Sequence, residues 1–182
     1  MTHKPDVHFL IIGSGGNKEK LEKLVAKNNL NNIRFFPLVP NEKLPALLAS
    51  ADLHLVLQKK SASDLVMPSK LTGILAAGGR PVVTAEPGTS LYEMIETHKL
   101  GILVKPESPV ELSRAIETAL ATDLSLYRQH ARQYAVDYLS RDSIMKKFEM
   151  EIYSRLKKSP VLSYVPASHS PNHSNVLSIK KR

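Results

Sequence analysis

The stretch with the clearest chemical potential lies in the middle of the chain, where Pro68, Ser69 and Lys70 open a predicted helix. Proline is favoured in the first turn of a helix, and the free amides of that turn, together with the helix dipole, bind anions such as phosphate. A lysine in the first turn opposes the dipole, so its position favours an anion bound between them. The alternative is a Lys70 side chain that simply points into solvent.

A second candidate is the glycine-rich turn Gly13-Ser14-Gly15-Gly16, which follows the first apolar run of the chain. Glycines at the end of a strand allow a ligand to approach the backbone closely. Lys18 stands where the dinucleotide pattern G-x-G-x-x-G needs its third glycine, and no acidic residue ends the apolar run 33–36 to hold a ribose. We therefore expect no NAD site. A turn that merely needs small residues is the alternative to a ligand contact.

Several kinds of chemistry are excluded by residue type. The chain has no cysteine, which rules out disulfides, thiolate zinc sites and cysteine nucleophiles and favours a reducing cytosol. The seven histidines are scattered, and no two are four apart on a predicted helix. We therefore expect no metal site. No residue is assigned a catalytic role.

The net charge of +8 favours anionic partners, namely phosphorylated substrates, anionic lipid headgroups or nucleic acid. Lys180, Lys181 and Arg182 supply three of these charges at the end of the chain. Aromatic residues make up only 5% of the chain, which argues against a nucleic-acid surface built on base stacking. The last two predicted helices are also basic. Their charged face is a solvated surface, a contact with anionic lipid or a face that meets another domain.

The elements that must position these residues are short apolar runs alternating with amphipathic stretches. The predicted strands are 7–12, 33–36, 53–57, 81–84 and 101–104, and the first of them is expected to be buried. The predicted helices are 17–29, 41–51, 68–77, 88–98, 109–121, 124–139 and 142–156. This alternation predicts an α/β, Rossmann-like fold with a parallel sheet of about five strands, flanked by helices on both faces and followed by C-terminal helices.

The domain organisation follows from composition. Residues 1–158 are predicted to form one domain, and 159–182, rich in Pro, Ser, His and Asn, a disordered basic tail. No run of about 18 apolar residues indicates a transmembrane helix. We expect a cytoplasmic protein, with peripheral contact at the inner face of the plasma membrane as the finer alternative.

The order of motifs resembles family 4 (group 1) glycosyltransferases of the GT-B fold, in the branch that builds exopolysaccharide and colanic-acid-type polymers. The resemblance rests first on the run from Asp64 through Met67-Pro68-Ser69-Lys70 to Gly78-Gly79-Arg80-Pro81-Val82-Val83. It extends over most of the folded chain through Ile12-Gly13-Ser14-Gly15, Pro40 to Pro45, Ala49 to Asp52, Pro87-Gly88-Thr89 and Gly101 to Pro106.

The resemblance implies that the chain is the donor-binding half of a hexosyltransferase. Such an enzyme transfers a sugar from a nucleotide-diphosphate sugar to a glycan or lipid-linked acceptor in polysaccharide biosynthesis, with retention at the anomeric carbon and with no cofactor or obligatory metal. The implied donor-binding residues are Gly13, Gly15, Val39, Val66, Met67, Pro68, Ser69, Lys70, Leu71 and Thr72. Gly13 and Gly15 would line the cleft between two domains, and Val39 would meet the base through its backbone.

Two departures from the family pattern lead to a second hypothesis. Gly73 stands where the family often has a glutamate that binds the donor ribose, and Thr72 beside it is only a partial substitute. The family's acceptor domain, and the first strand of its donor domain with a following basic pair, have no counterpart in the sequence. The alternative function is therefore a truncated or split-subunit nucleotide-binding domain with no activity alone. A third reading, a basic domain that binds nucleic acid, predicts steep salt dependence of binding.

Overall fold

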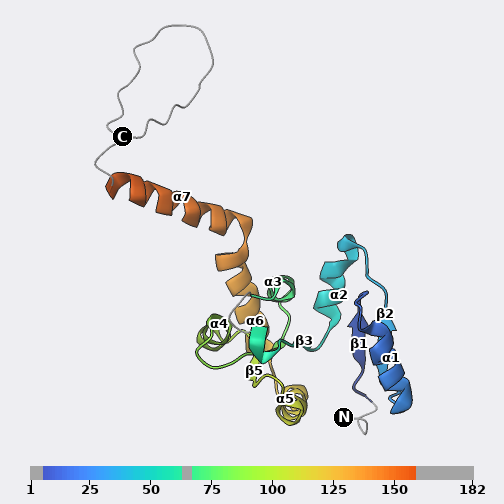
Figure 1. The fold of residues 1–182 in the computed structure, drawn as a ribbon. Coiled ribbons are helices and arrows are strands. Elements are labelled where there is room, and N and C mark those ends of the chain that lie inside the picture. The colour runs from blue at the N-terminus through green and yellow to red at the C-terminus, as the bar shows by residue number, and fades with distance from the viewer. Residues whose placement is uncertain (1–5, 63–66, 159–182) are drawn as a thin grey trace, which may run out of the picture. The chain divides into compact units, whose positions relative to one another are not determined.

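A computed structural model describes residues 6–62 and 67–158 of the chain. The chain divides into two compact units after Ile144, and each is described by itself. The first contains all the strands, in the order β1 (Phe9–Ile12), β2 (Ile33–Phe36), β3 (His54–Val56), β4 (Pro81–Thr84) and β5 (Ile102–Val104) (Figure 1). The five predicted strands are therefore all present, each within two residues of its predicted bounds.

The helices also follow the predicted pattern. The α-helices are α1 (Lys18–Lys27), α2 (Leu44–Ser50), α3 (Ser69–Ala76), α4 (Ser90–His98), α5 (Pro109–Ala121), α6 (Ser125–Tyr134) and α7 (Arg141–Lys158). Two short 3₁₀ turns, η1 (Asn41–Lys43) and η2 (Lys60–Ala62), precede α2 and follow β3. The stretch predicted as a single helix over 124–139 is α6 continued by a π-helical segment, η3 (Ala135–Leu139).

Every strand pair is parallel, as predicted, but the strands form two sheets rather than one. Phe9 is in register with Ile33 in the β1–β2 sheet. In the second sheet the order is β3-β4-β5, with His54 beside Pro81 and Val82 beside Ile102. Because hydrogen bonding between strands depends on which edges meet in space, the apolar pattern alone could not foresee this division.

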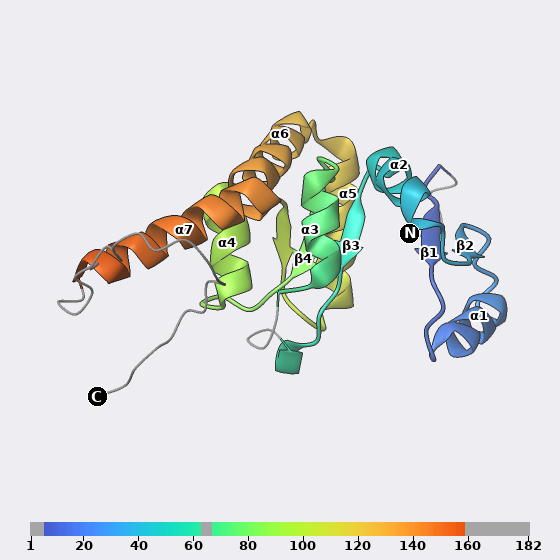
Figure 2. The ribbon, with the colours of Figure 1, turned by 90° about the horizontal axis from the view of Figure 1, so that it is seen from above.

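The hydrophobic core lies in the second sheet and its helices. The helix α3 contacts β3 and β4, and it also contacts α2, α6 and η3 (Figure 2). Every residue of β4 is buried. The buried cluster consists of Val56, Leu71, Ile74, Leu75, Val83, Ala85, Leu91, Ile95, Leu100, Ala131 and Ala135. Burying a Leu or Ile side chain of this kind stabilises the fold by about 1.5–3 kcal/mol.

The first sheet corrects two expectations. The strand β1 is not buried, since Leu10 is 53% and Ile11 37% exposed, and the β1–β2 sheet is not covered on both faces. On α1 the apolar residues Leu21 and Leu24 are also exposed. An apolar run predicts a strand from local preference, but its burial depends on other elements packing against it, and among the described residues no such cover is present.

Local sequence explains how α3 and α4 are bounded. Gly78 adopts a left-handed φ of +64° just after α3, and the Gly79 N–H donates to the Ile74 carbonyl at 2.8 Å. This confirms the predicted glycine stop. At the start of α4 the Thr89 hydroxyl accepts a hydrogen bond from the Tyr92 N–H at 3.2 Å. The end of α3 lies at the amino edge of the sheet, before β4, and the start of α4 lies at its carboxyl edge, after β4.

Candidate functional site

The helix α3 begins at Ser69, directly after Pro68, as the sequence predicts. Pro68 is extended, with φ −60° and ψ 119°, and no side chain caps the helix. The Leu71 N–H donates to the Pro68 carbonyl at 2.9 Å, which closes the first turn. The first amides of a helix have no partner within the helix, so this turn has the geometry that an anion requires.

The two polar residues of that turn are both accessible. Ser69 and Lys70 are exposed. Within the described part of the chain, no carboxylate forms an ion pair with Lys70. An exposed ammonium group with no ion pair to a described carboxylate fits both an anion contact and a solvent-facing lysine. The phosphate-binding role of Lys70 therefore stays a prediction.

The next two residues differ sharply in what they can offer a ligand. The Leu71 side chain is fully buried in the core, so only its backbone could meet a donor, and its N–H is already donated to Pro68. Thr72 is exposed, and its hydroxyl donates to the Ser69 carbonyl at 2.8 Å. The Thr72 oxygen keeps its acceptor capacity, which is the part of a missing carboxylate that it can replace.

Gly73 has a packing role that its sequence position did not reveal. A Cβ atom at residue 73 would lie 3.3 Å from Leu48 Cδ1 on α2. The helices α2 and α3 are in contact, so a larger residue at 73 would have to displace the Leu48 side chain. The family resemblance led us to look for a carboxylate at residue 73. Glycine stands there instead, and it allows α2 and α3 to pack closely.

The predicted donor residues fall into two groups. Gly13, Gly15 and Val39 lie at the carboxyl end of the β1–β2 sheet, where Gly13 has a φ of +144° and its N–H donates to the Phe36 carbonyl at 3.1 Å. The residues from Met67 to Thr72 follow the carboxyl end of β3 in the other sheet. Of the described residues, no hydrogen bond or ion pair links the two groups. Val66 lies outside the described residues.

The carboxyl ends of β3 and β4 carry polar residues that the sequence analysis missed. The Gln58 N–H donates to Thr84 Oγ1 at 2.6 Å, and Thr84 Oγ1 donates to the Gln58 carbonyl at 2.9 Å. Lys60 Nζ lies 3.7 Å from Glu86 Oε1. The sequence did carry a signal for these residues. A polar residue directly follows each apolar run, Gln58 after Leu57 and Thr84 after Val83.

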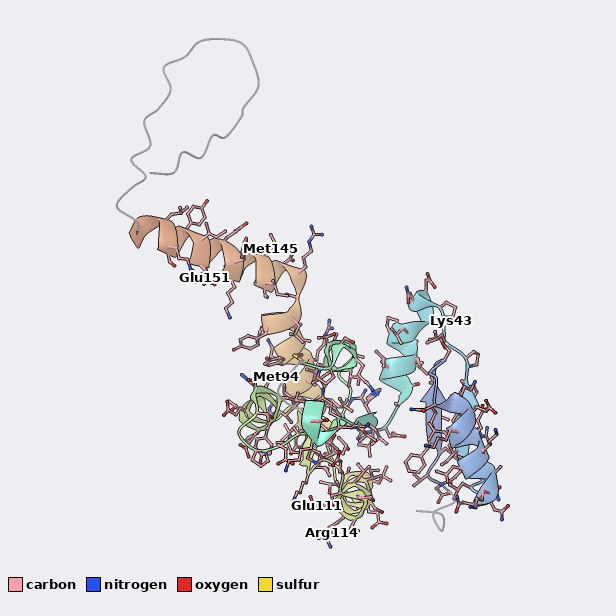
Figure 3. The ribbon with its side chains drawn as sticks, viewed as in Figure 1. Lys43, Met94, Glu111, Arg114, Met145 and Glu151 are labelled. Atoms are coloured by element: carbon pink, nitrogen blue, oxygen red, sulfur yellow. The ribbon has the colours of Figure 1, made fainter. Side chains whose placement is uncertain are left out.

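Among the described residues of the first unit, two pockets bear on function. One, of about 380 Å³, is formed by β5, α5 and the start of α6, and includes Glu111 and Arg114 (Figure 3). The other, of about 370 Å³, lies at the carboxyl ends of β4 and β5 and includes Glu86, Tyr92 and Lys105. Neither includes a predicted donor residue. In parallel sheets, ligands bind at the carboxyl ends of strands, and the second pocket lies at that edge.

His54, in the second sheet, has a pKa that its surroundings change. Burial lowers the pKa of His54 from its usual value, the hydrogen bond to the Leu48 carbonyl opposes this, and Arg80 lowers it further. His54 Nε2 lies 2.9 Å from that carbonyl oxygen. Because His54 is the first residue of β3, it stands at the opposite end of the strand from the carboxyl edge, and its role is structural.

These features define the class of protein. Parallel strands alternate with helices, and a proline-started helix with an accessible lysine follows the carboxyl end of a strand, as in one half of a GT-B fold. The family model for Glycosyl transferases group 1 matches residues 1–137. The chain belongs to that family.

Related proteins agree with this family assignment. The chain is 43% identical over 145 residues to WcaI of Escherichia coli strain K12, described provisionally as a colanic acid biosynthesis glycosyl transferase; the match covers 79% of this chain and 35% of WcaI. It is 26% identical to the probable glycosyltransferase WbjE of Pseudomonas aeruginosa, over 84% of this chain and 38% of that protein. The chain thus spans little more than a third of the length of these curated relatives.

The same fold recurs in two solved structures of low sequence identity. Anabaena HepE in complex with UDP-glucose has a TM-score of 0.67 at 18% identity, over 82% of this chain and 42% of HepE. The sucrose-phosphate synthase of Thermosynechococcus elongatus has a TM-score of 0.68 at 19% identity, over 87% of this chain and 41% of that enzyme. In both cases the described fold corresponds to part of a larger chain.

Proposed function

We propose that this domain binds a nucleotide-diphosphate sugar and is the donor half of a retaining glycosyltransferase of polysaccharide biosynthesis. The observation that carries the proposal is the start of α3 at Pro68-Ser69-Lys70, in a chain whose family match covers that helix. HepE, a structure with the same fold, is described with UDP-glucose bound, which supports a nucleotide sugar as ligand and substrate.

The chemical role of this helix start follows from its charge. As the bond between sugar and diphosphate breaks, negative charge grows on the diphosphate leaving group. Backbone amides of the first turn of α3, with the exposed ammonium group of Lys70, would stabilise that charge without reorganising, which is electrostatic preorganisation. No metal or resident cofactor is part of the proposal.

The proposal assigns acceptor binding to a domain outside the described residues, either in the same polypeptide or in a separate subunit. The chain matches only 35% of WcaI and 42% of HepE, so these proteins have ample further chain to form such a domain. The competing function, a nucleotide-binding domain with no activity alone, makes the same binding prediction. Sugar transfer measured with the domain alone and with a complementary acceptor domain added distinguishes the two.

Helix α7 bears on the proposed partners. The apolar residues Ile144, Phe148 and Ile152 recur every four residues and are 41–57% exposed. At about 100° per residue, Glu151 falls at one border of this stripe, Glu149 and Lys147 lie equally far from its middle on opposite sides, and Lys146 falls on the other face. An anionic membrane favours cations beside such a stripe, and here acidic and basic residues both flank it, so its charge favours neither a protein surface nor lipid as partner.

No helix within residues 6–62 and 67–158 is both long and apolar enough to cross a bilayer. Sedimentation with phosphatidylglycerol vesicles tests the remaining, peripheral mode of membrane contact. Equal binding to these vesicles and to neutral phosphatidylcholine vesicles would argue against the lipid surface. Strong, salt-sensitive binding to the anionic vesicles alone would instead favour the lipid surface.

Calorimetric titration with UDP, GDP and ADP sugars tests the proposed function, and binding of at least one of them below millimolar concentration is expected. The variant Lys70→Ala should lose about 1–3 kcal/mol of nucleotide binding, the value of a charge-assisted hydrogen bond. It should not lose stability, because a cation at the start of a helix is unfavourable for the helix itself.

The matched control is Lys20→Ala, an exposed lysine on α1 that forms no ion pair with any described residue. Its affinity should equal that of the unchanged protein. If none of the nucleotide sugars binds, the donor-site proposal is wrong. If they bind and Lys70→Ala retains full affinity, Lys70 is a solvent-facing lysine and the helix amides alone remain as the phosphate contact.

A further inference from the structure

The pocket at the carboxyl ends of β4 and β5 has the dimensions and wall chemistry of a ligand site. Its volume of about 370 Å³ lies within the usual range for small-molecule pockets, about 300–1,000 Å³. The walls combine apolar residues of β5, Leu103 and Val104, with the polar residues Glu86, Tyr92 and Lys105. A mixed apolar and polar wall suits a ligand with both carbon faces and hydroxyl groups.

The Glu86 carboxylate is the unusual group in this wall. Its Oε1 atom is buried, and no donor among the described residues lies within hydrogen-bond distance of it. Lys60 Nζ, at 3.7 Å, forms an ion pair but lies too far away for a hydrogen bond. Since 67% of the Lys60 side chain is exposed, the pair is screened by solvent and contributes little. A buried acceptor without a donor is costly unless a ligand supplies one.

The chain places Glu86 beside the proposed donor-binding edge. The two Gln58–Thr84 hydrogen bonds tie the carboxyl end of β3 to that of β4, two residues before Glu86. Lys60, the partner of Glu86, belongs to η2 in the segment that leads from β3 to α3. The carboxylate therefore belongs to the same sheet edge as the start of α3, and it comes from an element other than α3.

We propose that Glu86 accepts hydrogen bonds from a vicinal pair of hydroxyl groups of the nucleotide sugar. It would thereby supply, from the end of β4, the carboxylate that α3 lacks at Gly73. An ionised carboxylate has about four acceptor positions, so it can bind two hydroxyls while facing Lys60. This inference rests on the proposed function. The shared chemistry is a cis or trans diol, which both the ribose and the transferred sugar contain.

The test compares the unchanged protein with Glu86→Gln by calorimetric titration with UDP and with UDP-glucose. The amide keeps the size of the side chain but removes its charge and half of its acceptor capacity, so we expect affinity for UDP-glucose to fall at least about fivefold. If Glu86 binds the ribose, UDP should weaken by the same factor. If it binds the transferred sugar, UDP binding should be unchanged.

The control is Glu93→Gln, which removes the same charge from an exposed position of α4. Its affinity should remain that of the unchanged protein, and thermal unfolding should show both variants folded. Equal UDP-glucose affinity in Glu86→Gln and the unchanged protein would overturn the inference and leave the proposed function intact. So would an equal loss in both variants. If the unchanged protein binds none of the UDP, GDP and ADP sugars, the proposed function itself is wrong.

Discussion

The β1–α1–β2 segment and the β3–β4–β5 sheet are built from the same kind of sequence, yet they differ completely in burial. In β4 the residues Val82 and Val83 are fully buried, whereas Leu10 in β1 is 53% exposed. The helices α3, α4 and α6 supply core residues around the second sheet, and no residue of β1, α1 or β2 belongs to that core. Local sequence preference is enough to form parallel apolar strands in both regions. Within the described ranges, only the second region has helices packed on its sheet to form a core, and that packing stabilises it.

The largest expected effect compares Leu75→Ala in α3 with Leu24→Ala in α1. Leu75 is fully buried and Leu24 is 55% exposed. We expect Leu75→Ala to lose about 2–5 kcal/mol of unfolding free energy through lost burial and a cavity. Leu24→Ala should lose less than about 1 kcal/mol. Urea unfolding followed by circular dichroism measures both, and equal losses would show that the first sheet is as well covered as the second.

A smaller effect compares two glycines, one from each region. A Cβ atom at Gly101 would lie 2.3 Å from the Pro81 carbonyl oxygen, and backbone atoms cannot move aside cheaply. Gly101→Ala should therefore cost about 1–3 kcal/mol. Gly16→Ala meets no atom within 4 Å and should leave the melting temperature nearly unchanged or slightly higher. A tolerant Gly101 would mean that β4 and β5 approach each other less rigidly than the structure shows.

The smallest effect concerns pH and the second sheet alone. Burial, the largest cause, lowers the pKa of His54 below its usual value of 6.5. The unfolded chain therefore binds a proton at this residue more readily than the folded chain, and stability falls as the pH drops below about 6.5 toward the folded pKa. Urea unfolding at a series of pH values should show this loss, and His54→Gln should reduce it.

An NMR titration of the His54 ring provides the independent check on that effect. A ring that titrates at or above 6.5 would contradict the buried environment. Unfolding curves of His54→Gln that keep the whole pH dependence would assign it to other groups. Either outcome would mean that the two sheets differ less in burial than the structure shows, because the lowered pKa of His54 depends on its burial in the second sheet.

Much of the candidate site was predictable because its determinants are local. Pro68 fixes the start of α3, and Gly78 and Gly79 fix its end, so the helix and its exposed Lys70 follow from neighbouring residues. Glu86 was not predictable as a candidate. Its carboxylate becomes a candidate only because it lines a pocket and forms an ion pair with Lys60, which is 26 residues away in the chain.

The sequence alone determined the strands, the helices and the family resemblance, because hydrophobic period, proline and glycine act within a few residues. Tertiary structure alone decided that the strands divide into a two-stranded and a three-stranded sheet, and that β1 is exposed while β4 is buried. It also decided that residue 73 packs against Leu48, where the family often has a glutamate that binds the donor ribose. These outcomes depend on which distant surfaces meet, and a contact between helices such as α2 and α3 is specified by their joint shapes.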